Sequence, residues 1–162
     1  MIDSKPYILI VDDNKITTRL LRKYIEANGF ESGDAGDGIE CLESLSIRRP
    51  NAIFLDVMMP RMDGMDTVRA IKANPATRTI PVVIVTALND VATQAKAVEA
   101  GADDFLTKPI EENLLIAKCK LLTELDRQRS TVAALKEVVH AFRSGQASTP
   151  RVAQLLTELD QQ

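Results

Sequence analysis

Short apolar runs alternate with amphipathic segments over roughly the first 110 residues of the chain. A short apolar run bounded by turn residues is typical of a strand that is buried on both faces of a sheet. By this criterion we predict strands at Tyr7–Val11, Phe30–Ala35, Ala52–Leu55, Ile80–Val85 and Phe105–Thr107. The second of them is more polar than the others, which suits the edge of a sheet.

Segments with apolar residues at helical spacing separate these strands. The predicted helices are Thr17–Asn28, a helix opened by Asp37-Gly38 and closed by Arg49-Pro50, Gly64–Ala73, Ala92–Ala100 and a last one that starts near Glu111. Strands that alternate regularly with helices indicate a doubly wound α/β fold, in which helices cover both faces of a parallel sheet. Crossovers between such strands are right-handed by default.

Polar residues follow these strands at the same end. Asp12 and Asp13 come directly after the first strand, and Asp56 comes after the third. Thr86 follows the fourth strand and Lys108 follows the fifth. Because ligands of doubly wound sheets bind at the carboxyl ends of the strands, we expect these five residues to share one site.

The chemistry of these side chains favours phosphoryl capture. Three carboxylates repel one another unless a cation joins them, and oxygen ligands without Cys or His favour a hard ion such as Mg²⁺. A carboxylate can act as the nucleophile and form an aspartyl phosphate. Lys108 offers a compact positive charge to phosphate oxygens, and Thr86 offers a hydroxyl donor.

At these residues the chain resembles the receiver domain of bacterial two-component response regulators, and in particular a chemotaxis-type receiver. The matching motifs are ILIVDDN at 8–14, FLDVMMPRMDG at 54–64, VIVTA at 83–87 and GADDFLTKPI at 101–110. The resemblance covers roughly residues 5–120 and implies a flavodoxin-like, five-stranded parallel sheet of order 2-1-3-4-5.

The resemblance also implies the role of each acid. Asp56 would be the phosphoacceptor, which takes its phosphoryl group from a sensor histidine kinase, a phosphotransfer protein or a small phosphodonor. Asp13 and Asp56 would ligate Mg²⁺ together with the backbone carbonyl of Met58. Asp12 would act on the ion largely through water.

Further roles follow from the same resemblance. Thr86 and Lys108 would bind the phosphoryl oxygens. Phe105 matches an aromatic switch that moves inward when the threonine engages phosphate, and the Lys108–Pro109 bond is usually cis in this family. Phosphorylation would then change the face formed by the helix near residues 90–100, the last strand and the final helix.

Two other function classes fit parts of the same pattern. One is a phosphatase or phosphotransferase that turns over at Asp56, but such enzymes place a second acid where this chain has Met58. The other is a flavin-binding module, but the acidic residues disfavour a phosphate without a metal, and no Ser/Thr/Gly-rich loop follows the first strand. We therefore predict a signalling domain rather than a turnover enzyme. Because Met58 and Leu88 are apolar and cannot orient a water molecule for attack on the phosphoryl group, the phosphorylated chain should dephosphorylate slowly.

Structural roles compete for several of these residues. Asp12, Asp13 and Asn14 could cap the following helix, because Asp and Asn are favoured at that position. Asp63-Gly64 reads as turn and cap chemistry, and Asp103-Asp104 as a loop pair outside the site. His140, on a predicted helix, is expected to be solvated rather than to donate phosphate.

Helical periodicity continues beyond residue 120. Apolar residues fall on the a and d positions of one heptad frame, with Lys118 and Gln128 as polar interruptions; they are Leu114, Leu121, Leu125, Val132, Leu135, Val139 and Phe142. Glu124 and Arg129 occupy g and following e positions, which pair across a parallel two-stranded coiled coil. We predict a homodimer through this helix. The alternative is an amphipathic helix that folds back on its own domain.

The predicted organisation is a receiver over residues 1–120, a helical extension over 121–142, and a linker with a short terminal helix over 143–162. The linker is RSGQASTP, and the helix is Arg151–Asp160. The hexapeptide LLTELD occurs at both 121–126 and 155–160, which is too little to indicate a repeat architecture.

Composition restricts the partners. A net charge of −3 and a pI near 5.2 argue against a nucleic-acid or anionic-membrane surface, and no helix-turn-helix signal follows the receiver. Cys41 and Cys119 read as free thiols of a reducing cytosol. The N-terminal residues do not resemble a signal peptide, and no apolar run approaches the roughly 20 residues of a membrane span. We therefore expect a cytoplasmic location.

Overall fold

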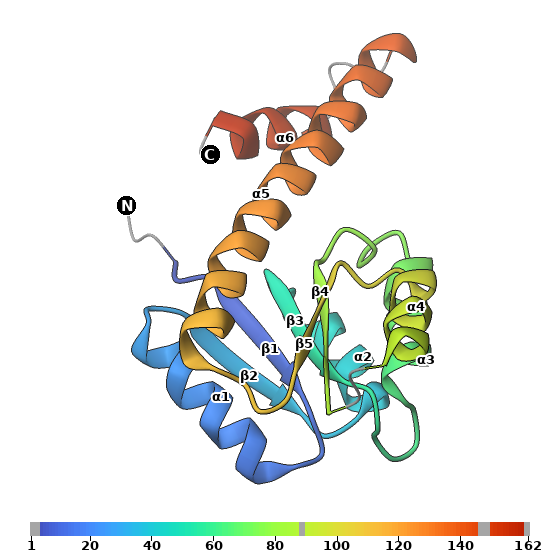
Figure 1. The fold of residues 1–162 in the computed structure, drawn as a ribbon. Helices are drawn as coiled ribbons and strands as arrows, with labels where there is room; N and C mark the ends of the chain where they lie inside the picture. The colour runs from blue at the N-terminus through green and yellow to red at the C-terminus, as the bar shows by residue number, and fades with distance from the viewer. Residues whose placement is uncertain (1–3, 88–89, 146–149, 161–162) are drawn as a thin grey trace. The chain divides into compact units, whose positions relative to one another are not determined.

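The computed structural model describes residues 4–87, 90–145 and 150–160. Over these residues the strands form one parallel sheet, ordered β2-β1-β3-β4-β5, as the resemblance implied (Figure 1). The strands are β1 (Tyr7–Val11), β2 (Glu31–Ala35), β3 (Ala52–Asp56), β4 (Val82–Thr86) and β5 (Asp104–Thr107). The predicted α/β fold with a doubly wound parallel sheet is confirmed.

The helices follow the predicted order, with ends shifted by one or two residues. They are α1 (Lys15–Ala27), α2 (Gly38–Ile47), α3 (Gly64–Ala73), α4 (Val91–Ala100), α5 (Glu112–Arg143) and α6 (Pro150–Asp160). Each of the first four begins after an Asn or Asp whose side chain accepts a backbone N–H of the first turn; these residues are Asn14, Asp37, Asp63 and Asp90. The cap at Asn14 explains why α1 begins two residues earlier than the apolar pattern indicated.

Both faces of the sheet are buried, which explains why its central strands are continuous apolar runs. Alternate residues of β1, such as Ile8 and Leu9, belong to different apolar clusters. One cluster includes residues of α1 and of the first part of α5, and the other includes residues of α2, α3 and α4. Figure 1 shows α1 on one side of the sheet and α3 with α4 on the other.

The chain divides into two compact units, Met1–Asp126 and Arg127–Gln162, so α5 contributes to both. In the first unit, α5 buries a set of side chains against the sheet and α1, namely Leu115, Ile116, Cys119 and Leu122. Leu125 also packs partly buried against this cluster, and Lys118 pairs with Asp104. Leu125 and Lys118, two positions of the predicted heptad seam, therefore have their contacts within the first unit.

The second unit consists of the remainder of α5 together with α6. Val138 of α5 and Val152 and Leu155 of α6 are buried, and Arg151 lies 3.3 Å from a carboxylate oxygen of Glu137. The helix predicted at Arg151–Asp160 is present as α6, one residue longer at its start. Within the described residues, no helix is both long enough and apolar enough to cross a bilayer.

Candidate functional site

Three carboxylates meet at the carboxyl edge of the sheet. Each of Asp12, Asp13 and Asp56 offers one oxygen, and these oxygens lie within 4.8 Å of one another. The side chain of Asp12 is 3% exposed and that of Asp56 is 13% exposed, whereas Asp13 is exposed. The structure thus brings together the acids that the strand ends predicted.

Strand pairing produces this convergence. β1 and β3 are neighbours with Val11 opposite Leu55, so Asp12 and Asp56 leave the sheet side by side. The backbone N–H of Asn14 donates to Asp12 Oδ1 at 2.8 Å, and the N–H of Val57 donates to Asp56 Oδ1 at 2.8 Å. The Oδ1 atom of each acid is therefore held by the backbone of the following loop.

Lys108 binds the other oxygens of these two acids. Its Nζ atom lies 3.0 Å from Asp12 Oδ2 and 3.5 Å from Asp56 Oδ2. The backbone N–H of Lys108 donates to the carbonyl of Thr86 at 2.9 Å, and the Lys108–Pro109 peptide bond is cis. The ammonium group reaches the acids from β5, on the far side of β4.

The site carries surplus negative charge, because three carboxylates face one ammonium group. Burial raises the pKa of Asp56, Lys108 lowers it and Asp12 raises it further, and the net direction is upward. Burial lowers the pKa of Lys108, but its hydrogen bond to Asp12 and the charge of Asp56 prevail and raise it. The donors are all oxygens at mutual distances that one ion can span, so the residues fit a hard divalent cation such as Mg²⁺.

Thr86 and Phe105 lie on the two strands beyond β3. Thr86 ends β4, is 3% exposed and stands opposite Thr107 of β5. Phe105 stands opposite Ile84 and is partly buried against the apolar cluster that contains Ile84 and Ala97. Both residues therefore belong to the strands that also position Lys108.

The loop after β3 carries Met58, whose side chain is 70% exposed. It lines a surface hollow together with Asp13, Val57, Met59, Pro60 and Asp63. Leu88, the second apolar residue linked to dephosphorylation, lies outside the described residues.

Other acids near the strand ends have structural partners. Asp63 accepts the backbone N–H of Asp66 at 2.9 Å and caps α3, as the sequence indicated. Asp103 accepts from Lys72 Nζ at 3.0 Å and from the N–H of Val82 at 2.8 Å. These contacts fix loops and helix ends.

Gly64 is a positioning residue that side-chain chemistry does not reveal. Its N–H donates to the carbonyl of Val57 at 2.8 Å, and a Cβ at this position would lie 2.2 Å from the carbonyl oxygen of Asp56. Only glycine permits this approach, which closes the loop directly behind the phosphoacceptor candidate. The signal in the sequence was Asp63-Gly64, which also reads as an ordinary turn.

Comparison with known proteins agrees with this geometry. The model of the response regulator receiver domain family matches residues 8–120. Response regulator PleD of Caulobacter vibrioides is 39% identical over 145 residues, which cover 90% of this chain and 30% of that protein. Response regulator MprA of Mycobacterium ulcerans is 35% identical over 127 residues, which cover 78% of this chain and 54% of that protein. The chain thus spans less than two thirds of either relative.

Solved structures show the same fold. The signal receiver domain of a signal transduction histidine kinase from Syntrophus aciditrophicus superposes with a TM-score of 0.69 at 38% identity, covering 74% of this chain and 90% of that one. The receiver domain of the Francisella response regulator 1452 gives a TM-score of 0.69 at 29% identity, and the match covers 74% of this chain and 98% of that one. The family match covers more than half of the chain and contains each residue of the acidic site. The chain therefore belongs to the response regulator receiver domain family.

Proposed function

We propose that Asp56 accepts a phosphoryl group from a sensor histidine kinase or a phosphotransfer protein in the cytoplasm, and that the phosphorylated chain is a signalling state. Receiver domains in general have this role. The observation that carries the proposal here is the cluster of Asp12, Asp13 and Asp56 with Lys108 Nζ at 3.0 and 3.5 Å from two of them.

The transfer conserves atoms and charge in a simple way. A carboxylate oxygen of Asp56 forms a new bond to phosphorus while the phosphorus–nitrogen bond of a phosphohistidine breaks. The electron pair of that bond returns to the imidazole nitrogen of the donor. Lys108 stands where it can pair with phosphoryl oxygens, and Thr86 can donate its hydroxyl to them.

Asp13, Asp56 and the backbone carbonyl of Met58 would hold Mg²⁺, with Asp12 acting through water. The bound ion supplies positive charge that offsets the surplus of carboxylates and the charge of the incoming phosphoryl oxygens. The exposure of Asp13 and the hollow beside Met58 leave the site open to water and to a donor.

The signal would leave the site through β4 and β5. Engagement of Thr86 by phosphate would let Phe105 move further inward and alter the face formed by α4, β5 and α5. Because Met58 is apolar, we expect slow hydrolysis of the acyl phosphate and no turnover of phosphate esters. A phosphoprotein lifetime of seconds in purified protein with Mg²⁺ would contradict this expectation.

The test is the intact mass of the full chain after incubation with a small phosphodonor and Mg²⁺. We expect one phosphoryl group on the wild-type chain, none on Asp56→Asn and none when a chelator removes the metal. Asp63→Asn is the matched control, because this acid lies in the same loop but caps α3, and Asn is also a good cap. Phosphorylation of Asp56→Asn at the wild-type rate would overturn the proposal.

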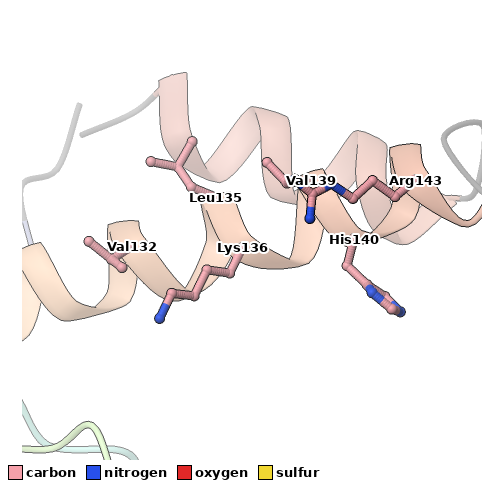
Figure 2. A pocket seen from close by; sticks show the side chains of 6 residues that line it. All are labelled: Val132, Leu135, Lys136, Val139, His140 and Arg143. Atoms are coloured by element: carbon pink, nitrogen blue, oxygen red, sulfur yellow. The ribbon is translucent and has the colours of Figure 1, made fainter.

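We further propose that the second half of α5 forms a homodimer with a second copy. Its a and d positions are 48–60% exposed; they are Val132, Leu135, Val139 and Phe142. Figure 2 shows three of them lining one hollow with Lys136, His140 and Arg143. Val138, elsewhere on α5, is buried, whereas these four residues are about half exposed, which suits a parallel partner helix.

Sedimentation of the full chain tests this second proposal. We expect a dimer for the wild type and a monomer for Leu135→Glu combined with Val139→Glu. Thr157→Glu, which adds a charge at an exposed position of α6, should leave the dimer intact. A monomeric wild-type chain at high concentration would rule the dimer out, whatever the result for phosphorylation.

A further inference from the structure

Arg61 adopts a backbone conformation that side chains rarely take. Its φ is +63°, and among the described residues it is the non-glycine residue with positive φ. Such a conformation costs a non-glycine residue roughly 1 kcal/mol or more and persists where surrounding contacts determine it. A glycine would be unstrained at this position. The contacts of the side chain therefore require an explanation.

The guanidinium group of Arg61 binds a buried acid on another loop. Its Nε donates to Asp37 Oδ2 at 2.6 Å, its Nη2 lies 2.5 Å from the same oxygen, and Nη2 lies 3.5 Å from Glu40 Oε1. The side chain of Asp37 is 5% exposed. The backbone N–H of Glu40 and the charge of Arg61 both hold the pKa of Asp37 below its usual value.

Asp37 is itself fixed, so it can serve as an anchor. Its Oδ1 accepts the N–H of Glu40 at 3.0 Å and caps α2. The next residue, Gly38, donates its N–H to the carbonyl of Met62 at 3.4 Å. The loop after β2 and the loop after β3 are therefore joined by an ion pair and by a backbone contact.

This junction holds the segment that follows Asp56 at Arg61 and Met62. The N–H of Gly64 donates a hydrogen bond to the carbonyl of Val57 at 2.8 Å, which joins the two ends of this loop. Met58 lies between these two attachments. The position of its carbonyl thus depends on a loop that Arg61 fastens to α2.

We propose that Arg61 is a positioning residue for the metal site: its ion pair with Asp37 holds the loop so that the Met58 carbonyl faces the position of Mg²⁺. This inference rests on the proposed function, because it assumes the ion held by Asp13, Asp56 and Met58. In the proposed site, Arg61 contacts neither the phosphoryl group nor the ion.

Magnesium affinity of the full chain, measured by calorimetry, tests the inference. Arg61→Gly removes the ion pair without introducing backbone strain, and we expect it to weaken Mg²⁺ binding about fivefold, less than the roughly tenfold loss typical when a group bonded directly to a metal ligand is removed. Asp37→Asn keeps a helix cap but loses the charge and should weaken binding similarly. Arg61→Lys retains the positive charge but loses the planar guanidinium group that donates through two nitrogens. Its Mg²⁺ affinity should lie between those of the wild type and Arg61→Gly.

Arg69→Ala is the matched control, because Arg69 also pairs with an acid, Asp66, at 2.7 Å on the adjacent helix α3, away from the loop. It should bind Mg²⁺ as the wild type does. Amide hydrogen exchange without metal gives a second readout: residues 57–63 should exchange faster in Arg61→Gly than in Arg69→Ala.

The outcomes separate this inference from the proposed function. If the wild-type chain binds no Mg²⁺, the proposed metal site itself fails. If the wild type binds Mg²⁺ and Arg61→Gly binds it equally well, only the role of Arg61 is overturned. A lowered melting temperature with unchanged Mg²⁺ affinity would likewise reduce the ion pair to a structural link.

Discussion

Carboxylates at the two edges of the sheet differ in how completely their charge is balanced by neighbouring donors. At the carboxyl edge, Asp12, Asp13 and Asp56 share one ammonium group from Lys108. At the amino edge, the carboxylate of Asp126 is 3% exposed and accepts hydrogen bonds from Arg49 and Asn51.

The donors at the amino edge come from the segment before β3. Arg49 donates from Nη2 to Asp126 Oδ1 at 2.6 Å and from Nη1 to Oδ2 at 3.0 Å, which is a bidentate pair. Asn51 Nδ2 adds a bond to Oδ2 at 3.0 Å, and Asn51 Oδ1 accepts the N–H of Tyr7 at 2.8 Å. The guanidinium group also donates to Thr79 Oγ1 at 3.2 Å.

The difference lies in charge balance. A buried carboxylate whose charge and lone pairs are matched contributes to the folded structure and has little left to offer a ligand. A group of acids with surplus charge and an open side is a binding site, because a cation can complete it. The acids of a receiver can therefore be sorted by their partners rather than by their residue type.

The largest effect on stability is expected for a substitution of Asp126 at the amino edge of the sheet. Asp126→Asn removes the charge opposite Arg49 and should lower the free energy of unfolding by about 3 kcal/mol, the low end for a broken buried pair because Arg49 is partly exposed. Urea denaturation measures this change. Asp160→Asn is the matched control, since the same LLTELD segment in α6 leaves its acid exposed and should lose almost nothing.

Phosphorylation at the carboxyl edge should not depend on Asp126. Folded Asp126→Asn should still accept a phosphoryl group at the wild-type rate, because Asp126 lies at the opposite edge of the sheet from Asp56. A variant that stays as stable as the wild type would show that the Arg49 pair is not the main anchor of this part of α5.

Mg²⁺ should stabilise the folded chain by binding to the acids at the carboxyl edge of the sheet. At a concentration about 100 times its dissociation constant, a ligand that binds only the folded state adds about 2.7 kcal/mol. We expect this increment in the wild type and also in Asp126→Asn, but not in Asp13→Asn. Thermal or urea unfolding with and without Mg²⁺ measures it, and an equal increment in Asp13→Asn would exclude that residue as a ligand.

A smaller effect is expected when one acid of the site is neutralised without metal. Burial raises the pKa of Asp56, Lys108 opposes this and Asp12 adds to it, so the ionised carboxylate opposes folding near neutral pH. Asp56→Asn should therefore be more stable than the wild type in chelator at neutral pH. The gain should shrink as the pH falls through the raised pKa of Asp56 and vanish below the pKa of the unfolded chain.

Chemical denaturation at neutral and acidic pH measures that difference. A gain that grows toward acidic pH would have the wrong sign and would indicate that Lys108 over-compensates the acids. Added Mg²⁺ should reverse the order and make the wild type the more stable protein.

The smallest effect is expected for an exposed charge at the amino edge. Arg48 lies over the ring of Tyr7 at 4.0 Å from its centroid and pairs with Glu31 at 2.6 Å, and both charged side chains are about half exposed. Arg48→Leu should cost only about 0.5 kcal/mol in urea denaturation. A loss as large as that of Asp126→Asn would mean that exposed charges, rather than the buried carboxylate, stabilise this edge.

Local sequence patterns were enough to predict the order of strands and helices, the caps at Asn14, Asp37 and Asp63, and a group of five candidate site residues. Apolar runs identify strands buried on both faces, and Asn or Asp before a helix can cap it; both are local properties. Five residues could be grouped because each lies at or just after the end of a strand, and parallel strands end at one edge; they are Asp12, Asp13, Asp56, Thr86 and Lys108.

The contacts that each of these side chains makes depend on the folded arrangement of distant segments. Asp126 and Asp160 end identical hexapeptides, yet one is buried against Arg49 and the other is exposed. Helical periodicity likewise marked Leu125 and Val132 as one seam, although Leu125 packs on the apolar cluster of the first unit and Val132 is half exposed. Periodicity shows which side of a helix is apolar, whereas what covers that side depends on contacts between residues far apart in the chain.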